Sequence, residues 1–464
     1  MNLSIVNLFY LASAVLFITG IKGLTRPRTA VRGNLLAAIG MLVAVVVTLL
    51  NQSILSYGWI LAGGVIGATV GVLLATRIQM TAMPQMVALL NGFGGGASLS
   101  VATASFLSAA GPVAASGAVS LLAIGLTVLI GAVTLTGSAV AFGKLQELLP
   151  GNATGFKGIT LFNAALLGLA VVIVATLTAG GGGTWLLLLL IAIALVLGVT
   201  LVIPIGGADM PVVIALLNSY SGVAAAAAGF IMGNTVLIVS GALVGASGLI
   251  LTRIMCVAMN RSLTGVLFGS LSEEEGEGLD ADEVYAGKVK SSSPEEVSML
   301  LETAQRVVIV PGFGLAMAQA QHAVRDLADT LERRGVEVIY GLHPVAGRMP
   351  GHMNVLLAEA EVEYDKMRTM DQVNPHFAQT DVAIVIGAND VTNPLAREDK
   401  GSPIYGMPIL DVDQARTVVV VKRSLSPGFA GLPNPLFAKD NTLMLFGDGK
   451  QAILELTGSL NEAA

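Results

Sequence analysis

The sequence has one cysteine among 464 residues, and only 12% of its residues are charged. The single thiol, Cys256, excludes an internal disulfide and offers no second sulfur ligand, so no metal site is predicted. The first 260 residues hold just two acidic residues, Glu147 and Asp209, and no histidine. A water-soluble domain of that length needs far more charge on its surface. This part of the chain is therefore predicted to lie in a lipid bilayer.

Almost all the acidic residues and all four histidines lie in residues 270–464, so the C-terminal part of the chain is predicted to contain a soluble domain. We predict a transmembrane domain over 1–260, a linker over 261–300 and a soluble domain over 301–464. The linker contains an acidic run at 272–278 and a serine-proline stretch at 291–294, both typical of a solvated connector. The net charge of −6 and the lack of a basic, aromatic-interleaved patch predict no nucleic-acid partner.

Nine apolar stretches are long enough to cross the membrane, because a helix needs about 20 apolar residues to span a ~30 Å hydrocarbon layer. They are 3–21, 34–51, 57–76, 84–108, 117–141, 158–179, 184–203, 209–232 and 234–256. An odd number of spans places the two termini on opposite sides of the membrane. The predicted class is thus a multi-span α-helical membrane domain with nine transmembrane helices, followed by a soluble domain.

The positions of the basic residues predict the orientation of the spans in the membrane, since cytoplasmic loops are rich in lysine and arginine. They cluster in alternate connections: Lys22, Arg26, Arg28, Arg32, Arg77, Lys144, Lys157, Arg253 and Arg261. The intervening connections, near 52–56, 109–116 and 180–183, carry no charge. We therefore expect the N-terminus outside and the soluble domain in the cytoplasm, or in the matrix of an organelle.

Two segments of the membrane domain repeat each other without a gap. Residues 83–95 and 210–222 share Met-Pro, Ala-Leu-Leu-Asn and a final glycine, which places Asn91 and Asn218 at equal depth in two helices. A buried asparagine in lipid can join helices or line a water-filled path. Asp209, at the mouth of the second repeat, can be a helix cap or a proton-relay carboxylate. The sequence alone does not decide between these roles, either for the two asparagines or for Asp209.

The soluble domain alternates short apolar strands with helices, a rhythm typical of a parallel, doubly wound, Rossmann-like α/β fold. Strands are expected near 307–310, 336–341, 381–386, 408–412, 417–421 and 441–446. The first runs into Gly312 and Gly314 and then a predicted helix, as in dinucleotide-binding units. Gly312 is expected to permit the tight turn, and Gly314 the approach of the backbone to a pyrophosphate. Met317 occupies the third glycine position of this motif.

The second strand predicts the type of nucleotide. NAD-binding folds place an acidic residue at its end to hold the ribose 2′-hydroxyl, and residues 340–348 contain none. Lys422, Arg423 and Ser424 follow another strand and could instead clamp a 2′-phosphate, although a solvated basic pair is the alternative. NADP(H) is therefore the expected cofactor.

Two further loops are expected to border the cofactor. Gly387, Ala388, Asn389 and Asp390 end a strand, and Asp390 could either begin a turn or sense the redox or protonation state of the nicotinamide. The stretch 426–435 is rich in glycine and proline and could cover the cofactor. The four histidines lack metal-like spacing and are interpreted as surface or loop residues: His322, His343, His352 and His376.

These motifs together resemble the beta subunit of proton-translocating NAD(P) transhydrogenase over nearly the whole chain. The resemblance rests on Val310–Gly314 with Ala318–Gln321, Gly347–His352, Gly387–Asp390 and Lys422–Ser424. It implies NADP(H) on this chain and NAD(H) on a separate alpha subunit, which adds further membrane helices. It also implies a dimer of alpha–beta units in a bacterial cytoplasmic (inner) membrane, and direct hydride transfer coupled to proton movement.

The resemblance assigns roles to individual residues. Arg348 would lie near the pyrophosphate, Lys422 to Ser424 at the 2′-phosphate, and Asp390, the expected catalytic residue, near the nicotinamide. The other expected cofactor-binding residues are Gly312, Phe313, Gly314, Ala316, Met317, Gly347, Gly387, Ala388 and Asn389. Asn91, Ser138, Asp209 and Asn218 would mark the proton path or its coupling. Many family members have histidine in place of Asn91, and asparagine cannot titrate near neutral pH, so a partner subunit or water would carry the proton there.

The main alternative is a transporter or channel gated by a nucleotide-sensing domain, which has the same architecture without chemistry. Such sensors often prefer NAD and carry the acid after the second strand, and no potassium-filter sequence is present. A membrane-anchored NADP dehydrogenase is a third possibility. It would need one membrane helix rather than nine, and the chain shows no substrate acid–base constellation.

Overall fold

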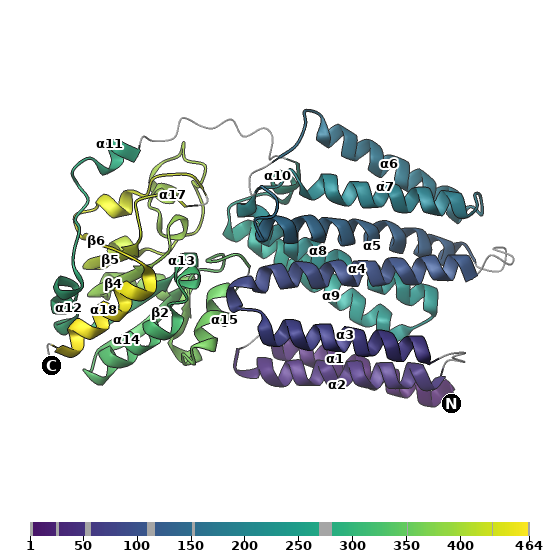
Figure 1. Ribbon diagram of the computed structural model, residues 1–464, viewed down its shortest axis with the longest axis horizontal. Helices are drawn as coiled ribbons and strands as arrows, with labels where there is room; N and C mark the ends of the chain where they lie inside the picture. The colour runs from purple at the N-terminus through teal and green to yellow at the C-terminus, as the bar shows by residue number, and fades with distance from the viewer. Residues whose placement is uncertain are drawn as a thin grey trace. The chain divides into compact units, whose positions relative to one another are not determined.

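The computed structural model describes residues 3–24, 27–51, 57–108, 117–150, 154–268, 281–349, 351–428 and 430–462. The chain divides into two compact units (Figure 1). One comprises Met1–Gly206 with Val213–Thr252, and the other comprises Gly207–Val212 with Arg253–Ala464. The acidic run at 272–278 and the charge-free connections at 52–56 and 109–116 lie outside the described residues.

Nine helices in the described ranges have the length and apolar composition of membrane spans, which confirms the nine predicted stretches. They are α1 (Leu3–Leu24), α2 (Pro27–Asn51), α3 (Gly58–Arg77), α4 (Met83–Ser108), α5 (Ala118–Leu145), α6 (Ile159–Thr178), α7 (Thr184–Val202), α8 (Met210–Met232) and α9 (Thr235–Ala258). The largest difference from prediction is α2, which begins at Pro27 rather than near residue 34. Proline is favoured in the first turn of a helix, where its missing N–H has no partner to lose.

Glycines let the membrane helices approach one another closely. A Cβ atom on Gly95 of α4 would lie 2.7 Å from the carbonyl oxygen of Gly131 in α5, and a Cβ on Gly131 would lie equally close to the oxygen of Gly95. In the same way, a Cβ on Gly222 of α8 would lie 2.8 Å from the carbonyl oxygen of Gly241 in α9, and a Cβ on Gly241 would lie 2.7 Å from the oxygen of Gly222. In lipid, helix association depends on this backbone-to-backbone packing rather than on a hydrophobic driving force.

The soluble unit contains a six-stranded, all-parallel sheet with the strand order β3-β2-β1-β4-β5-β6. Its strands are β1 (Arg306–Pro311), β2 (Glu337–Leu342), β3 (Met367–Thr369), β4 (Val382–Ile386), β5 (Thr417–Lys422) and β6 (Thr442–Phe446). The central strands are buried runs of valine and isoleucine, as expected when helices cover both faces of a parallel sheet. This order is that of a doubly wound dinucleotide-binding fold and confirms the predicted fold class.

The helices of this unit are mostly short. They are α10 (Leu263–Phe268), α11 (Ala281–Tyr285), α12 (Pro294–Glu302), α13 (Phe313–Met317), α14 (Gln321–Arg333), α15 (His352–Glu359), α16 (Met370–Val373), α17 (Leu395–Glu398) and α18 (Gly449–Glu462). The predicted helix after the glycine pair is only the five-residue α13. The chain turns at Gln319, whose φ is +49°, before α14 begins.

One of the six predicted strands was wrong. Residues 408–412 form no strand, although Ile409 and Leu410 are 4% and 1% exposed. They are apolar because this loop is buried, so their composition resembles that of a strand. The sixth strand is instead β3, three residues at the sheet edge that pair only with β2. Two of its residues are exposed and polar, so it has no apolar run.

Part of the segment predicted as a linker belongs to the soluble unit. Residues 281–302 contain α11 and α12, and the chain between them pairs with β6 through a bridge from Ser291 to Met444. The Ser293 hydroxyl and the Glu296 carboxylate cap the start of α12 reciprocally. The same serine-proline sequence that is typical of a connector therefore serves as a helix start.

Candidate nucleotide-binding site

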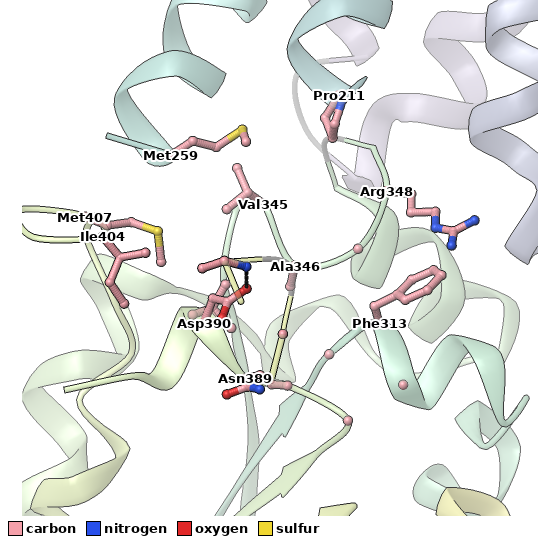
Figure 2. A pocket seen from close by; sticks show the side chains of 18 of the residues that line it. Pro211, Met259, Phe313, Val345, Ala346, Arg348, Asn389, Asp390, Ile404 and Met407 are labelled. Carbon is pink, nitrogen blue, oxygen red and sulfur yellow. Dashed lines mark hydrogen bonds between the residues drawn. The ribbon is translucent and has the colours of Figure 1, made fainter. Parts of the chain in front are cut away.

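A crevice opens where the carboxyl ends of β1, β4 and β5 meet the loop that follows β2 (Figure 2). In an open parallel sheet, ligands bind at the point where the strand order reverses, here between β1 and β4. Ten of the residues predicted to bind the cofactor line this crevice: Gly312, Phe313, Gly314, Gly347, Arg348, Gly387, Ala388, Asn389, Asp390 and Lys422. They come from four separate loops of the sequence.

Glycines bring the two central loops into direct contact. A Cβ on Gly312 would lie 2.4 Å from both Ala388 Cα and Gly387 O, and a Cβ on Gly314 would lie 2.6 Å from Gly387 Cα. The backbone N–H of Gly314 donates to Gly387 O at 2.9 Å. Gly387 itself has a φ of +63°, which favours glycine. The motif glycines therefore join the β1 and β4 loops, in addition to any approach to a ligand.

Arg348 and the ring of Phe313 form one wall of the crevice. The guanidinium carbon of Arg348 lies 4.5 Å from the centre of the Phe313 ring, within range of a cation–π contact (Figure 2). His352 is fully buried, and its Nδ1 accepts a hydrogen bond from the Arg348 backbone at 3.2 Å. These contacts fix the Arg348 loop and place a cation beside the crevice.

Asp390 forms part of the opposite wall. The backbone N–H of Ala430 donates to its Oδ2 at 3.1 Å, as drawn in Figure 2. A Cβ on Gly428 would lie 2.6 Å from both carboxylate oxygens. The glycine- and proline-rich loop expected to cover a cofactor therefore packs directly on Asp390.

Lys422 extends from the end of β5 into the same region. Its ammonium donates to Ser426 O and lies 5.0 Å from the centre of the Phe437 ring. Burial lowers the pKa of Lys422, and the carboxylate of Asp390 opposes that effect. A bound anion would stabilise the charged form of this half-buried lysine, because its attraction offsets part of the hydration that the ammonium has lost.

Four of the predicted residues do not line the crevice. Ala316 is fully buried and Met317 is 52% exposed. Arg423 and Ser424 are exposed beside Lys422, where the Ser424 hydroxyl lies 2.9 Å from that of Ser426. A phosphate held by Lys422 to Ser424 would thus contact one half-buried and two exposed groups.

The comparisons with known proteins settle the family. A model of the family described as NAD(P) transhydrogenase beta subunit matches residues 6–459. Two curated relatives from Rhodospirillum rubrum, each named NAD(P) transhydrogenase subunit beta, are 47% identical over 456 residues. The matches cover 97% of this chain and 98% of each relative. The chain belongs to the NAD(P) transhydrogenase beta subunit family.

Family membership makes the chain part of an enzyme that acts on nicotinamide nucleotides. It also gives a context to the polar residues of the membrane helices. Asn91 of α4 is 6% exposed, and its Nδ2 donates to the carbonyl oxygen of Ile214 in α8 at 3.3 Å. This bond joins the two repeated helices, which is one of the two roles left open by the sequence.

The other three residues predicted to belong to the proton path, Ser138, Asn218 and Asp209, have different surroundings. Ser138 of α5 is fully buried, and its hydroxyl has no hydrogen-bond partner within the described residues. A Cβ on Gly92 would lie 3.2 Å from its Cβ, so Ser138 packs one residue away from Asn91. Asn218 is partly buried in α8. Asp209 ends a short 3₁₀ helix before α8, with one carboxylate oxygen 4.0 Å from Nε of Arg261.

The structure places His322 and His376 at the surface and His343 in a loop, as interpreted, but His352 begins α15 and is not a surface or loop residue. His352 and His343 are buried, and His343 is only 3% exposed. The His343 Nε2 lies 2.8 Å from Pro408 O, and its Nδ1 accepts from the Val345 backbone at 3.3 Å. Both contacts suit a neutral ring that carries its proton on Nε2. No local sequence feature marks this role, because the partner Pro408 is distant in the chain.

His343 predicts a loss of stability in acid. Burial lowers its pKa to about 4, against an ordinary value of 6.5. Between these two pH values His343 binds a proton in the unfolded chain but not in the folded chain. The stability that the neutral, buried ring provides is therefore complete above pH 6.5 and is lost as the pH falls towards 4. The difference amounts to about 3 kcal/mol. Hydrogen exchange of the sheet amides, measured on the full chain at about pH 7 and about pH 4.5, should show weaker acid destabilisation in His343→Gln. The exposed His376→Gln is the control, and equal acid sensitivity in all three proteins would contradict the assignment.

Proposed function

We propose that this chain is the NADP(H)-binding and proton-translocating subunit of an enzyme that transfers hydride between NAD(H) and NADP(H). Family membership carries the proposal, and the crevice between β1 and β4 supports it. NAD(H) would bind to a partner alpha subunit that contributes further membrane helices, in a dimer of alpha–beta units. The membrane would be the bacterial cytoplasmic membrane, with the N-terminus outside and the nucleotide domain in the cytoplasm.

The residues of the crevice suit a dinucleotide with an extra phosphate. Gly312, Gly314 and Gly387 let the β1 and β4 loops meet at the crevice, because a Cβ atom at each position would clash with the backbone of the other loop. Arg348 and Lys422 supply positive charge from two different loops, and the β2 loop has no acidic residue to repel a 2′-phosphate. When bound, NADP(H) would supply the hydride acceptor or donor.

Each residue of the site has a proposed task. Arg348 would hold the pyrophosphate, and Lys422, Arg423 and Ser424 the 2′-phosphate. Asp390 would lie near the nicotinamide, where its contact with the Gly428–Ala430 loop would report on the state of the cofactor. Phe313, Ala316, Met317, Gly347, Ala388 and Asn389 would shape the surrounding pocket.

Proton translocation would give the reaction its direction. The two nicotinamide couples have nearly equal potentials, so hydride transfer alone has little driving force. One charge that crosses 100 mV supplies ~2.3 kcal/mol, or about fifty-fold in the product ratio. Asn91, Ser138, Asp209 and Asn218 would line or couple the path. Since the nine spans contain no histidine, a partner group or water would carry the proton past Asn91.

The test is hydride transfer and proton uptake in vesicles that contain this chain with its alpha subunit. We expect Asp209→Asn to keep hydride transfer within about twofold and to lower coupled proton uptake at least about tenfold, because the amide cannot ionise. The matched control is Glu147→Gln, which removes the other acidic residue of the first 260 and is exposed. Unchanged proton uptake in Asp209→Asn would reduce Asp209 to a helix cap. Absence of hydride transfer in the wild-type complex would refute the proposed function itself.

A further inference from the structure

Tyr285 of α11 connects to two polar residues that line the crevice, Asn389 and Lys422, through one intervening residue in each case. We infer that Tyr285 is a positioning residue that holds the Asn389 turn and the Lys422 side chain in place for the cofactor. The inference rests on the proposed function, because it concerns the affinity of the crevice for NADP(H).

The hydroxyl of Tyr285 reaches the Asn389 turn through Asn434. The backbone N–H of Asn434 donates to the Tyr285 hydroxyl at 2.8 Å. Asn434 is fully buried, and its side-chain Nδ2 donates to the carbonyl oxygen of Asn389 at 3.1 Å. Burial raises the pKa of Tyr285, so its hydroxyl remains protonated. Two hydrogen bonds thus separate Tyr285 from the turn that contains Asp390.

The ring of Tyr285 reaches Lys422 through Phe437. The two rings stack with their centroids 6.4 Å apart and their planes 18° from parallel. Phe437 is fully buried, and the Lys422 ammonium lies 5.0 Å from the centre of its ring. Stacked rings and cation–π contacts both depend on ring orientation. The orientation of Phe437 therefore links Tyr285 to the cation proposed to bind the 2′-phosphate.

The chain after Tyr285 is fixed to the sheet edge. Met444 of β6 donates to Lys290 O at 2.7 Å, and the Ser292 backbone donates to Met444 O at 2.9 Å. The Lys290 ammonium also donates to Asp440 O at 2.6 Å. Tyr285 is therefore held against the core by its own segment, and α11 is the first described element after the gap at 269–280.

The experiment measures NADPH affinity of the full chain for Tyr285→Phe, which keeps the ring, and Tyr285→Leu, which removes it. We expect about threefold weaker binding for Tyr285→Phe and about tenfold weaker binding for Tyr285→Leu. Tyr364→Leu is the control, since Tyr364 is 40% exposed, follows α15 and does not line the crevice. Wild-type affinity in Tyr285→Leu would overturn the inference. If that variant fails to fold, wild-type affinity in Tyr285→Phe overturns the hydroxyl contact in the same way.

A double-mutant cycle separates positioning from simple stabilisation of the fold. If the ring of Tyr285 acts through Lys422, Tyr285→Leu should weaken binding only about threefold when added to Lys422→Met, which is the loss expected from the hydroxyl route to Asn389 alone. A residue that only stabilises the fold would weaken both backgrounds equally, and that result would contradict the inference. Failure of the wild-type chain to bind NADPH is a different outcome, because it refutes the proposed function and not the contacts of Tyr285.

Discussion

Replacement of both Lys422 and Arg423 by alanine is expected to weaken NADPH binding by about 100-fold or more and to change NADH binding less than about threefold. The two nucleotides differ only in the 2′-phosphate. Lys422 is half-buried and lines the crevice, so it would form a charge-assisted contact of the stronger kind. Arg423 is exposed and would add less, because solvent screens its charge. Calorimetry with each nucleotide measures the difference directly.

The control for this pair removes the same charge elsewhere. Arg333 and Lys400 are exposed and do not line the crevice, so their double alanine variant should keep wild-type affinity for both nucleotides. Equal losses of NADPH and NADH affinity in the Lys422–Arg423 variant would show that the two cations support the fold of the loop and do not select the 2′-phosphate.

The second large effect is expected at Gly312. In Gly312→Ala the new methyl group would lie 2.4 Å from Ala388 Cα and from Gly387 O, closer than real Cβ contacts occur. Both neighbours are backbone atoms in the adjacent loop, so the β1 and β4 loops must separate. Overpacking of this kind costs about 1–3 kcal/mol in stability. Since the displaced loops form the crevice, we expect NADPH affinity to fall at least about thirtyfold.

Thermal unfolding and NADPH titration of the same samples test this prediction. Gly458→Ala is the matched control, because Gly458 lies in α18 and a Cβ there would meet no atom within 4 Å. Alanine should stabilise that helix by about 0.5–1 kcal/mol and leave affinity unchanged. Retention of wild-type affinity by Gly312→Ala would show that the crevice tolerates separation of its loops and that its geometry does not control binding.

Elements with a strong local pattern could be predicted from the sequence. The nine spans are long apolar runs, and five strands are short, largely buried apolar runs. The short edge strand β3 could not be predicted, because its residues are polar and its pairing with β2 is a tertiary contact. Residues 408–412 were wrongly predicted as a strand, because they form a buried loop and a buried loop can be as apolar as a strand.

The candidate site followed the same rule. Residues beside a glycine motif or at a strand end, such as Gly312, Asp390 and Lys422, were named from the sequence and are found together in the crevice. Groups that act through distant partners were not. Asn434 was named only as part of the stretch 426–435, and nothing in the sequence marks the hydrogen bond of its amide to Asn389, forty-five positions away. Tyr285 fell inside a predicted linker, where only the fold shows that it packs on Phe437.

Nucleotide binding to the purified full-length chain, measured by calorimetry with NADPH and with NADH, tests the central claim most directly. The proposed function predicts that NADPH binds tightly and that NADH binds at least about 100-fold more weakly, because only NADPH carries the phosphate that Lys422 would hold. A preference for NADH, or no binding of either nucleotide, would contradict the account and favour a transporter gated by a nucleotide-sensing domain.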